Sequence, residues 1–251
     1  MRIERLADGL DAARARRAVM AAHLGAAGGE LLKRDGPSTV CAVDELVVKL
    51  RPIGGALGRL RALLGIAKED REWAGSAVLA SAGLRTARPV AIARWERSRA
   101  LIVERLSGPT LLRAVSEPRT LGEERALAEA LGGAVGALWR AGWWNRDAKP
   151  SNWIVTRLEA PAEVAAIDPG GLRRARGGAG WARMLASLVI EPLGLNVLPR
   201  RAQLWRCLAR GEAARGGTAR GGGDARRTWR AVAAIVAGHG DPRPRVDPRG
   251  R

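Results

Sequence analysis

The chain contains no phenylalanine, no tyrosine and only two cysteines. Two cysteines, Cys41 and Cys207, cannot build a disulfide-rich secreted scaffold or a cysteine-rich zinc site. The longest strongly apolar stretch, residues 184–199, contains Glu191 and Pro192, so it is too short and too interrupted for a membrane-spanning helix. The N-terminal segment lacks the apolar centre of a secretory signal peptide. We therefore expect a cytoplasmic protein.

Lysine and asparagine are also scarce, since four of the 43 basic residues are lysines and three residues are asparagines. The chain is instead rich in arginine, alanine and glycine, and it has nine tryptophans and a net charge of +18. This composition is typical of a GC-rich genome, so part of the charge reflects codon bias. A lysine kept in such a chain indicates a position where a compact charge serves better than the wide guanidinium of arginine.

The pattern of apolar residues changes along the 251-residue chain. Residues 31–50 and 88–106 are rich in short β-branched runs separated by turn residues, which is typical of antiparallel strands. The second half has helical periodicity apart from one short hairpin. The expected helices cover residues 1–24, 68–82, 121–142, 180–190, 200–211 and 225–238, and residues 51–66 are expected to form a connection. The sequence therefore predicts an α+β fold.

One segment combines several chemically capable side chains. Residues 145–152 read N-R-D-A-K-P-S-N, and a predicted hairpin separates them from Asp168-Pro169-Gly170. The pattern R-D-x-K-x-x-N … D-x-G resembles the catalytic loop and metal-binding motif of the protein-kinase-like fold. Lys49, at the end of a predicted strand, and Glu72, on the next helix, extend the resemblance upstream.

Within that superfamily the chain resembles the bacterial lipopolysaccharide kinases, which phosphorylate Kdo or heptose of the lipopolysaccharide core. The resemblance covers about residues 30–190. It rests on the segments LKRDGPSTV, REW…LASAGL…ARPV and RAGWWNRDAKPSNWIV. It implies a protein-kinase-like two-lobe fold, with a small antiparallel-sheet N-lobe carrying one helix and a mostly helical C-lobe. The implied limits are 1–26 for an N-terminal helical extension, 27–106 for the N-lobe, 107–240 for the C-lobe and 241–251 for a disordered tail.

The resemblance assigns roles to the residues of the second half. Asp147 would orient the attacking hydroxyl and accept its proton, and Lys149 would stabilise charge on the transferred phosphoryl group. Asn152 and Asp168 would hold Mg²⁺ through oxygen atoms, the ligand type that this ion prefers. Phosphoryl transfer depends on such positioning and charge neutralisation more than on covalent chemistry.

The resemblance also assigns an ATP site to the first half. Lys49 would bind the α- and β-phosphates while an ion pair with Glu72 fixes its side chain. Glu69, one helical turn earlier, is a competing partner, and Glu72 is favoured.

Two further segments would complete the ATP site. Backbone N–H groups of Gly36, Ser38 and Thr39 would face the phosphates, although this turn has a single glycine in place of the usual glycine-rich loop. The backbone from Glu104 to Leu106 would take the edge of the adenine.

Three departures from the kinase pattern bear on the acceptor. Asn145 stands where kinases usually have a histidine that supports the loop, and activity is expected to survive. Pro169 replaces the usual Phe or Leu, and no A-P-E-like segment follows Gly170. A peptide-binding activation segment therefore looks absent, which favours a sugar, lipid or other small acceptor.

The alternatives are a Ser/Thr protein kinase and a non-catalytic binder, either a pseudokinase or an arginine-rich module for anionic ligands. The arginines fit a solvated surface or an attraction to a phosphorylated glycolipid or an anionic inner-membrane face. The candidate clusters are Arg51, Arg59 and Arg61, and Arg173, Arg174 and Arg176. Specific nucleic-acid binding is not expected, because the sequence has no recognition motif for it. Trp143 and Trp144 are expected to pack beneath the catalytic loop.

Overall fold

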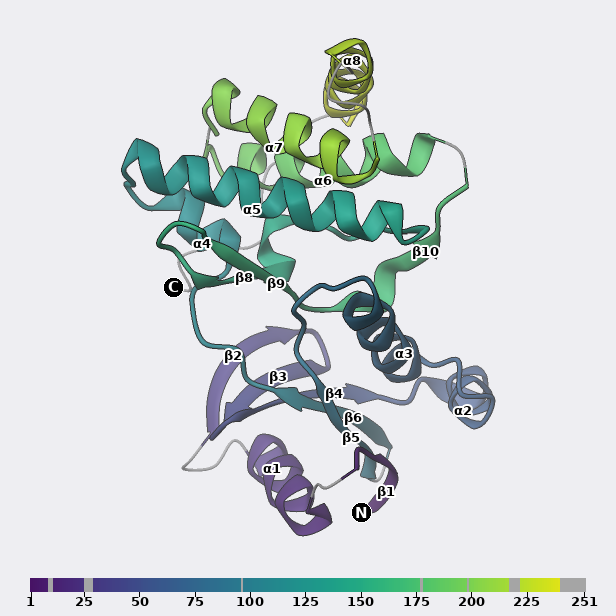
Figure 1. Ribbon diagram of the computed structural model, residues 1–251. Helices are drawn as coiled ribbons and strands as arrows, with labels where there is room; N and C mark the ends of the chain where they lie inside the picture. The colour runs from purple at the N-terminus through teal and green to yellow at the C-terminus, as the bar shows by residue number, and fades with distance from the viewer. Residues whose placement is uncertain are drawn as a thin grey trace. The chain divides into compact units, whose positions relative to one another are not determined.

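The computed structural model describes residues 1–8, 11–24, 29–95, 97–176, 178–197, 199–216 and 222–239. The chain divides into two compact units. The first, called here the sheet unit, joins Met1–Ala77 to Ala87–Leu106, and the second, the helical unit, joins Val78–Thr86 to Ser107–Arg251 (Figure 1). The predicted tail over 241–251 lies outside the described residues.

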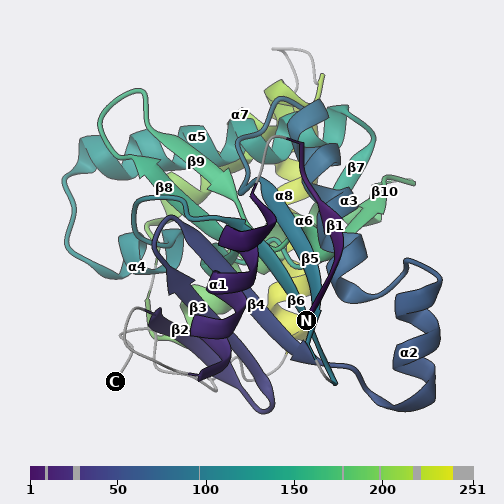
Figure 2. The same ribbon diagram turned by 90° about the horizontal axis from the view of Figure 1, so that it is seen from below.

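A six-stranded antiparallel sheet forms the sheet unit, in the order β1-β5-β6-β4-β3-β2. Its strands are β1 (Arg2–Leu6), β2 (Gly29–Asp35), β3 (Ser38–Val43), β4 (Leu46–Pro52), β5 (Pro89–Trp95) and β6 (Ser98–Glu104). Helix α1 (Ala12–Leu24) packs against this sheet and buries Ala15 and Val19 among Val48 and Ile102 (Figure 2). The mixed α+β class predicted from the sequence is confirmed.

Two predictions for the sheet unit are wrong. The helix expected over 1–24 is present only as α1, and the chain begins with β1, which pairs with the distant strand β5. Strand pairing at this distance supplies hydrogen bonds that the local arginine-rich sequence does not reveal. The expected connection over 51–66 contains helix α2 (Gly55–Leu63). Its two glycines have low helix propensity, so the sequence did not predict a helix there.

Helix α3 (Lys68–Ser81) lies close to its predicted range. Asp70 accepts a hydrogen bond from the Ala67 N–H at 3.2 Å at the first turn. Gly83, with φ of 75°, follows the last turn, where only glycine adopts this conformation at little cost. The division between the two units falls within α3, after Ala77.

The helical unit is built around α5 and α7. Its helices are α4 (Leu111–Ser116), α5 (Leu121–Arg140), α6 (Ala179–Gly194), α7 (Arg201–Ala214) and α8 (Gly222–Gly238). The predicted apolar stripe of α5, including Leu131, Val135 and Leu138, is buried. A Cβ added at Gly132 would overlap the Cys207 carbonyl of α7, so glycine permits this close approach.

Short elements hold the motif residues between these helices. The pairs are β7 (Trp143–Asn145) with β10 (Leu172–Arg174), and β8 (Trp153–Arg157) with β9 (Glu163–Ala166). The 3₁₀ turns are η1 (Pro150–Asn152) and η2 (Pro169–Gly171). The hairpin β8–β9 was predicted, whereas the pairing of β7 with β10 was not. Within the described ranges, no helix combines the length and apolarity that a bilayer crossing requires.

Candidate functional site

The peptide groups flanking Asp147 are held by two asparagines of the helical unit. The Asp147 N–H donates to Asn145 Oδ1 at 3.0 Å, and Asn152 Nδ2 donates to the Asp147 carbonyl at 2.8 Å. Asn145 and Asn152 are both buried, whereas the Asp147 side chain is 47% exposed. The backbone is therefore fixed while the carboxylate stays open to an approaching molecule.

Lys149 lies beside this carboxylate. Its Nζ is 3.6 Å from Asp147 Oδ1, and both side chains are partly exposed. An ion pair of this length in contact with water contributes little to stability, because solvent screens it. The pair therefore gathers opposite charges at one place rather than stabilising the fold.

Hydrogen bonds made by Trp153 and Ser151 hold the loop that follows Asp147. The indole Nε1 of Trp153 donates to the Ala148 carbonyl at 3.1 Å. Ser151 donates twice to Glu191, from its N–H at 2.8 Å and from its hydroxyl at 2.7 Å. In the sequence alone, Glu191 is only an interruption of an apolar stretch. Its position in α6 shows that it anchors the turn η1.

The second motif segment is joined to the first through Asn152. The Ile167 N–H donates to the Asn152 carbonyl at 2.9 Å, which brings Asn152 beside the peptide that leads into Asp168. Asp168 is half-buried and adopts left-handed backbone angles of φ 57° and ψ 59°. This conformation is uncommon outside glycine, and such strain clusters at functional sites.

Gly171 lies against the loop that contains Asn145 and Asp147. A Cβ added there would overlap Asn145 Oδ1 and would lie 3.2 Å from the Asp147 nitrogen. The Gly171 carbonyl also accepts from the Arg146 N–H at 3.1 Å. A larger residue would therefore push the two motif segments apart. The sequence alone does not predict this role for Gly171. The two consecutive glycines after Asp168 and Pro169 are the feature that could have indicated it.

The oxygen atoms of Asn152 and Asp168 suit a hard divalent cation. Asn152 uses its amide nitrogen for the bond to Asp147, so its Oδ1 is the atom oriented for another partner. Across the described ranges, His, Cys, Asp and Glu side chains nowhere gather in threes as a closed metal site. Mg²⁺ fits this chemistry, because it is commonly held by one or two protein ligands together with substrate phosphates.

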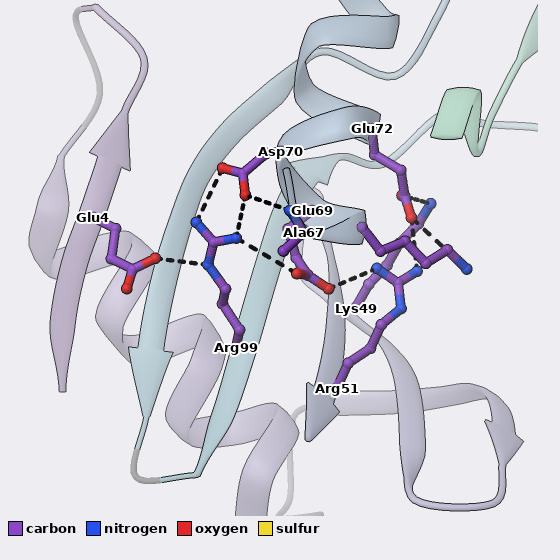
Figure 3. Close-up of polar contacts among 9 residues, drawn as sticks. Glu4, Lys49, Arg51, Ala67, Glu69, Asp70, Glu72 and Arg99 are labelled. Atoms are coloured by element: carbon purple, nitrogen blue, oxygen red, sulfur yellow. Dashed lines mark hydrogen bonds and ion pairs between the residues drawn. The ribbon is translucent and has the colours of Figure 1, made fainter. Parts of the chain in front are cut away.

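In the sheet unit, Lys49 and Glu72 form a close ion pair. Lys49 Nζ lies 2.7 Å from Glu72 Oε2, and Arg51 Nη2 lies 2.8 Å from Glu72 Oε1 (Figure 3). The Glu72 side chain is 1% exposed. Burial without such partners would be costly for a carboxylate, so the two cations offset its loss of hydration.

The competing carboxylate, Glu69, pairs with two arginines, one of which it shares with Glu72. It lies 3.1 Å from Arg51 Nη1 and 3.7 Å from Arg99 Nη1. Arg99 also binds Asp70, at 2.5 and 3.0 Å, and Glu4 of β1 at 2.6 Å. Burial opposes the charge on Arg99, but the bonds with Asp70 and Glu4 outweigh it and raise its pKa. Arg99 thus joins β6, α3 and β1, a role that sequence spacing does not reveal.

The predicted phosphate-binding turn is a tight hairpin. Gly36, with φ of 54°, and Pro37 connect β2 to β3, and Ser38 pairs with Asp35. Thr39 lies within β3, between its partners on β2 and β4. The contact of these backbone groups with phosphate stays a prediction.

The predicted adenine-binding backbone follows β6. The Glu104 N–H donates to the Arg88 carbonyl at 2.9 Å, and the Glu104 carboxylate accepts two bonds from the Arg88 guanidinium. Leu106 ends the sheet unit. The role of both residues toward adenine stays a prediction.

The arginine clusters do not all face solvent. The interpretation of Arg51 as part of an anion-binding surface is wrong, because its side chain is 15% exposed and its guanidinium pairs with Glu69 and Glu72. Arg174 stacks 4.0 Å from the centroid of the Trp143 ring, a cation–π contact. Arg59 and Arg61 are exposed.

No protein-family profile and no curated protein matches this chain. Solved structures do match. The bifunctional kinase-methyltransferase WbdD gives a TM-score of 0.51 at 18% identity, covering 80% of this chain and 47% of that chain. A second WbdD crystal structure gives 0.50 at 18% identity, covering 81% and 50%. A WbdD complex with the kinase inhibitor LY294002 gives 0.50 at 18% identity, covering 80% and 49%.

The chain spans about half the length of these WbdD structures. At this identity the likeness is evidence for the fold and not for a shared activity. Together with the antiparallel sheet and the helical second half, it indicates a kinase-like fold.

Proposed function

We propose that the chain is an ATP- and Mg²⁺-dependent phosphotransferase that acts on a sugar hydroxyl of a glycolipid resembling the lipopolysaccharide core. The observation that carries the proposal is the buried ion pair between Lys49 and Glu72, at 2.7 Å. The phosphotransfer motif requires this pair, and the two residues are 23 positions apart on a strand and a helix. WbdD is described as a bifunctional kinase-methyltransferase, and this residue set favours the kinase.

The residues have complementary tasks in the proposed reaction. The Asp147 carboxylate accepts the proton of the acceptor hydroxyl as its oxygen bonds to the γ-phosphorus of ATP. The bond between that phosphorus and the β–γ bridging oxygen breaks, and ADP leaves. Lys149 stabilises the negative charge on the transferred group. Lys49 holds the α- and β-phosphates, with Glu72 keeping its ammonium group in place.

Asn152 and Asp168 are the proposed Mg²⁺ ligands. When bound, the ion would neutralise phosphate charge, which is a large part of catalysis in phosphoryl transfer. Two hydrogen bonds support this role. One links Asn152 to the Asp147 carbonyl, and the other links the Asn152 carbonyl to Ile167, the residue before Asp168.

The short segment after the second motif supports a small acceptor. Strand β10 ends at Arg174 and helix α6 begins at Ala179. Few residues are available there to bind an extended peptide, whereas a sugar needs only a confined site. Arg173 in β10 and Arg176 just after it would suit a phosphorylated sugar or lipid headgroup. Such an acceptor would also place the protein at the inner membrane face.

A nucleotide-binding pseudokinase is the second candidate. The turn between β2 and β3 has Gly36 followed by Pro37, and proline offers no N–H group to a phosphate. A Ser/Thr protein kinase is the third. Transfer that depends on Asp147 separates the first function from the second, and the identity of the labelled acceptor separates it from the third.

Nucleotide binding is tested by thermal unfolding with ATP, with and without Mg²⁺, on the wild type and on Asp168→Asn and Lys49→Met. Glu159→Gln, an exposed carboxylate change in the same unit as Asp168, is the matched control. We expect a Mg²⁺-dependent rise in melting temperature for the wild type and the control, and its loss in the other two variants. An equal rise without metal would favour the pseudokinase.

Transfer is tested with γ-labelled ATP and lipopolysaccharide-core acceptors, with a generic protein substrate in parallel. We expect label on the sugar, and a loss of about 10²-fold or more in Asp147→Asn. Label on protein alone would overturn the proposed acceptor, and label that persists in Asp147→Asn would overturn the proposed catalytic residue.

A further inference from the structure

Helix α2 presents its apolar side chains to solvent. Leu57, Leu60, Leu63 and Leu64 are 59, 51, 80 and 62% exposed. No residue of the helix is buried. Figure 2 shows α2 projecting from the sheet of its own unit. Isolated exposed leucines are ordinary, but four within two helical turns form a continuous apolar face that the fold of this unit does not use.

The less exposed face of α2 is made of small residues. Gly58 lies against Ile53, since a Cβ added there would be 3.5 Å from the Ile53 side chain. Ala62, one turn later, is half-buried. At 100° per residue these two positions share a face opposite Leu60 and Leu63. A surface helix usually packs its leucines against the protein core, whereas the leucines of α2 face solvent.

Basic residues flank the leucine face. Arg59 and Arg61 are exposed on α2 and lie on either side of Leu60 around the helix. Between Glu45 and Glu69 the chain has no acidic residue. An apolar face bordered by arginine, on a segment without acidic residues, matches the acyl region and phosphates of an anionic bilayer. Glu69 lies near Arg61 but is buried and paired with Arg51 and Arg99. A protein partner would have to supply both an apolar groove and acidic rims.

We infer that α2 is a membrane-docking helix, which inserts its three leucines and the C-cap residue Leu64 into the interface of a bilayer containing anionic phospholipid. Arg59 and Arg61 would then contact the lipid phosphates. A helix of this kind lies in the plane of the interface and does not span it. The inference is independent of phosphotransfer, because α2 contains none of the proposed catalytic or ATP-binding residues.

Vesicle flotation tests the inference. The full-length protein is mixed with phosphatidylcholine vesicles, with or without about one-third phosphatidylglycerol. We expect binding to the anionic vesicles alone, weakened by salt. The double variant Leu60→Ser/Leu63→Ser should reduce the partition coefficient by about 100-fold or more. Leu121→Ser, at a leucine 60% exposed on α5, is the matched control.

The charge contribution has its own pair of variants. Arg59→Gln/Arg61→Gln should weaken binding about 30-fold, from roughly fivefold for each basic residue near the surface. Arg226→Gln/Arg227→Gln, two exposed arginines of α8, removes the same charge elsewhere and should change binding much less. Equal losses in the two pairs would mean that net charge alone attracts the protein, and would overturn the role of α2.

Insertion is observed directly with a fluorophore. Cys41 and Cys207 are buried, so an environment-sensitive label attached to Leu63→Cys reports that position alone. We expect its emission to shift to the blue with anionic vesicles, while the same label on Leu121→Cys stays unchanged. No shift at Leu63 would overturn insertion. Loss of self-association in Leu60→Ser/Leu63→Ser, without any vesicle binding by the wild type, would assign the face to a second protein copy instead.

Discussion

Glu72 binds two cations of the same strand, with Lys49 on one carboxylate oxygen at 2.7 Å and Arg51 on the other at 2.8 Å. Lys49 and Arg51 are two positions apart on β4, so their side chains leave the same face of the strand. The second cation helps Glu72 stay charged while its side chain is buried beside Lys49. Arg51 is thereby a positioning residue for the Lys49–Glu72 pair.

The first prediction compares Glu72→Gln with Glu69→Gln. Glu72→Gln should reduce kcat/KM for phosphotransfer by about 10²-fold or more, because Lys49 loses the charge that fixes it. Glu69→Gln should leave kcat/KM within about fivefold. Both should lower the melting temperature, since each leaves buried arginine charge less compensated. Steady-state rates and thermal unfolding measure the two effects, and equal loss of activity in both variants would contradict the assignment.

The second prediction concerns Asn145, whose Oδ1 accepts the Asp147 N–H at 3.0 Å. Asn145→Leu has a similar volume but no acceptor, so the buried N–H is left unpaired at a cost of about 1–3 kcal/mol. We expect kcat to fall about 10- to 100-fold with KM for ATP unchanged, because the loop shifts and the ATP site does not.

The control for Asn145→Leu is Asn145→Asp, which restores an acceptor oxygen. Partial recovery of kcat is expected in this variant. If both variants lose activity equally, the hydrogen bond to Asp147 is not what matters at this position.

The third prediction concerns close packing at Gly171. Gly171→Ala should destabilise the protein by about 1–3 kcal/mol, because the new methyl group would overlap Asn145 and force the two motif segments apart. Gly178→Ala is the matched control, since its added Cβ would meet nothing within 4 Å. Chemical unfolding should find the control within about 0.5 kcal/mol of the wild type. Equal stability of the two variants would contradict the close contact.

The fourth prediction concerns the two thiols. Burial raises the pKa of Cys207 to about 12, and burial also raises the pKa of Cys41, partly opposed by the charge of Arg34. The thiolate is the reactive form, so neither thiol should react with a disulfide reagent at mildly alkaline pH. Both should react once denaturant is added. Rapid reaction of the folded protein would mean that one of the two sites opens to solvent.

Local sequence patterns predicted much of the fold. Leu127, Leu131 and Val135 of α5 repeat at the helical period, and all three are buried as this period predicts. The pairing of β1 with β5 and of β7 with β10 was not predicted, because it depends on contacts between residues distant in sequence. Helix α2 was missed for another reason, because its leucines face solvent and its glycines lower its helix propensity.

The sequence also predicted that Lys49 would pair with Glu72 over Glu69. Helical spacing does not distinguish the two, because they lie one turn apart and both contact Arg51 of β4. The preference for Glu72 came from the resemblance to kinases, and Lys49 does pair with Glu72. The hydrogen bond from Asp147 to Asn145 and the close approach of Gly171 to Asn145 were not predicted. Both contacts depend on where Asn145, at the end of β7, lies relative to the Asp147 loop and to η2. The local sequence does not indicate this packing.

The fifth prediction concerns acid stability at the start of α5. Thr120 and Glu123 form a reciprocal cap, in which the Thr120 N–H donates to the Glu123 carboxylate at 2.8 Å and the Glu123 N–H donates to the Thr120 hydroxyl at 3.2 Å. The backbone bond from Thr120 is the main cause that lowers the pKa of Glu123. A carboxylate whose pKa is lower in the folded state stabilises the protein above its unfolded pKa of about 4.3, and this contribution is lost as the pH falls through the folded value.

Glu123→Gln should therefore be less stable than the wild type near neutral pH, and the difference should shrink as the pH falls below about 4. Thr120→Ala should cost about 1 kcal/mol, because the first turn loses its capping hydroxyl. Thr120→Ser keeps that hydroxyl and serves as the control. Chemical unfolding across this pH range measures all three variants. A difference for Glu123→Gln that stays constant into acid would mean that the charge of the carboxylate contributes nothing, and that the cap acts only through the shape of the side chain.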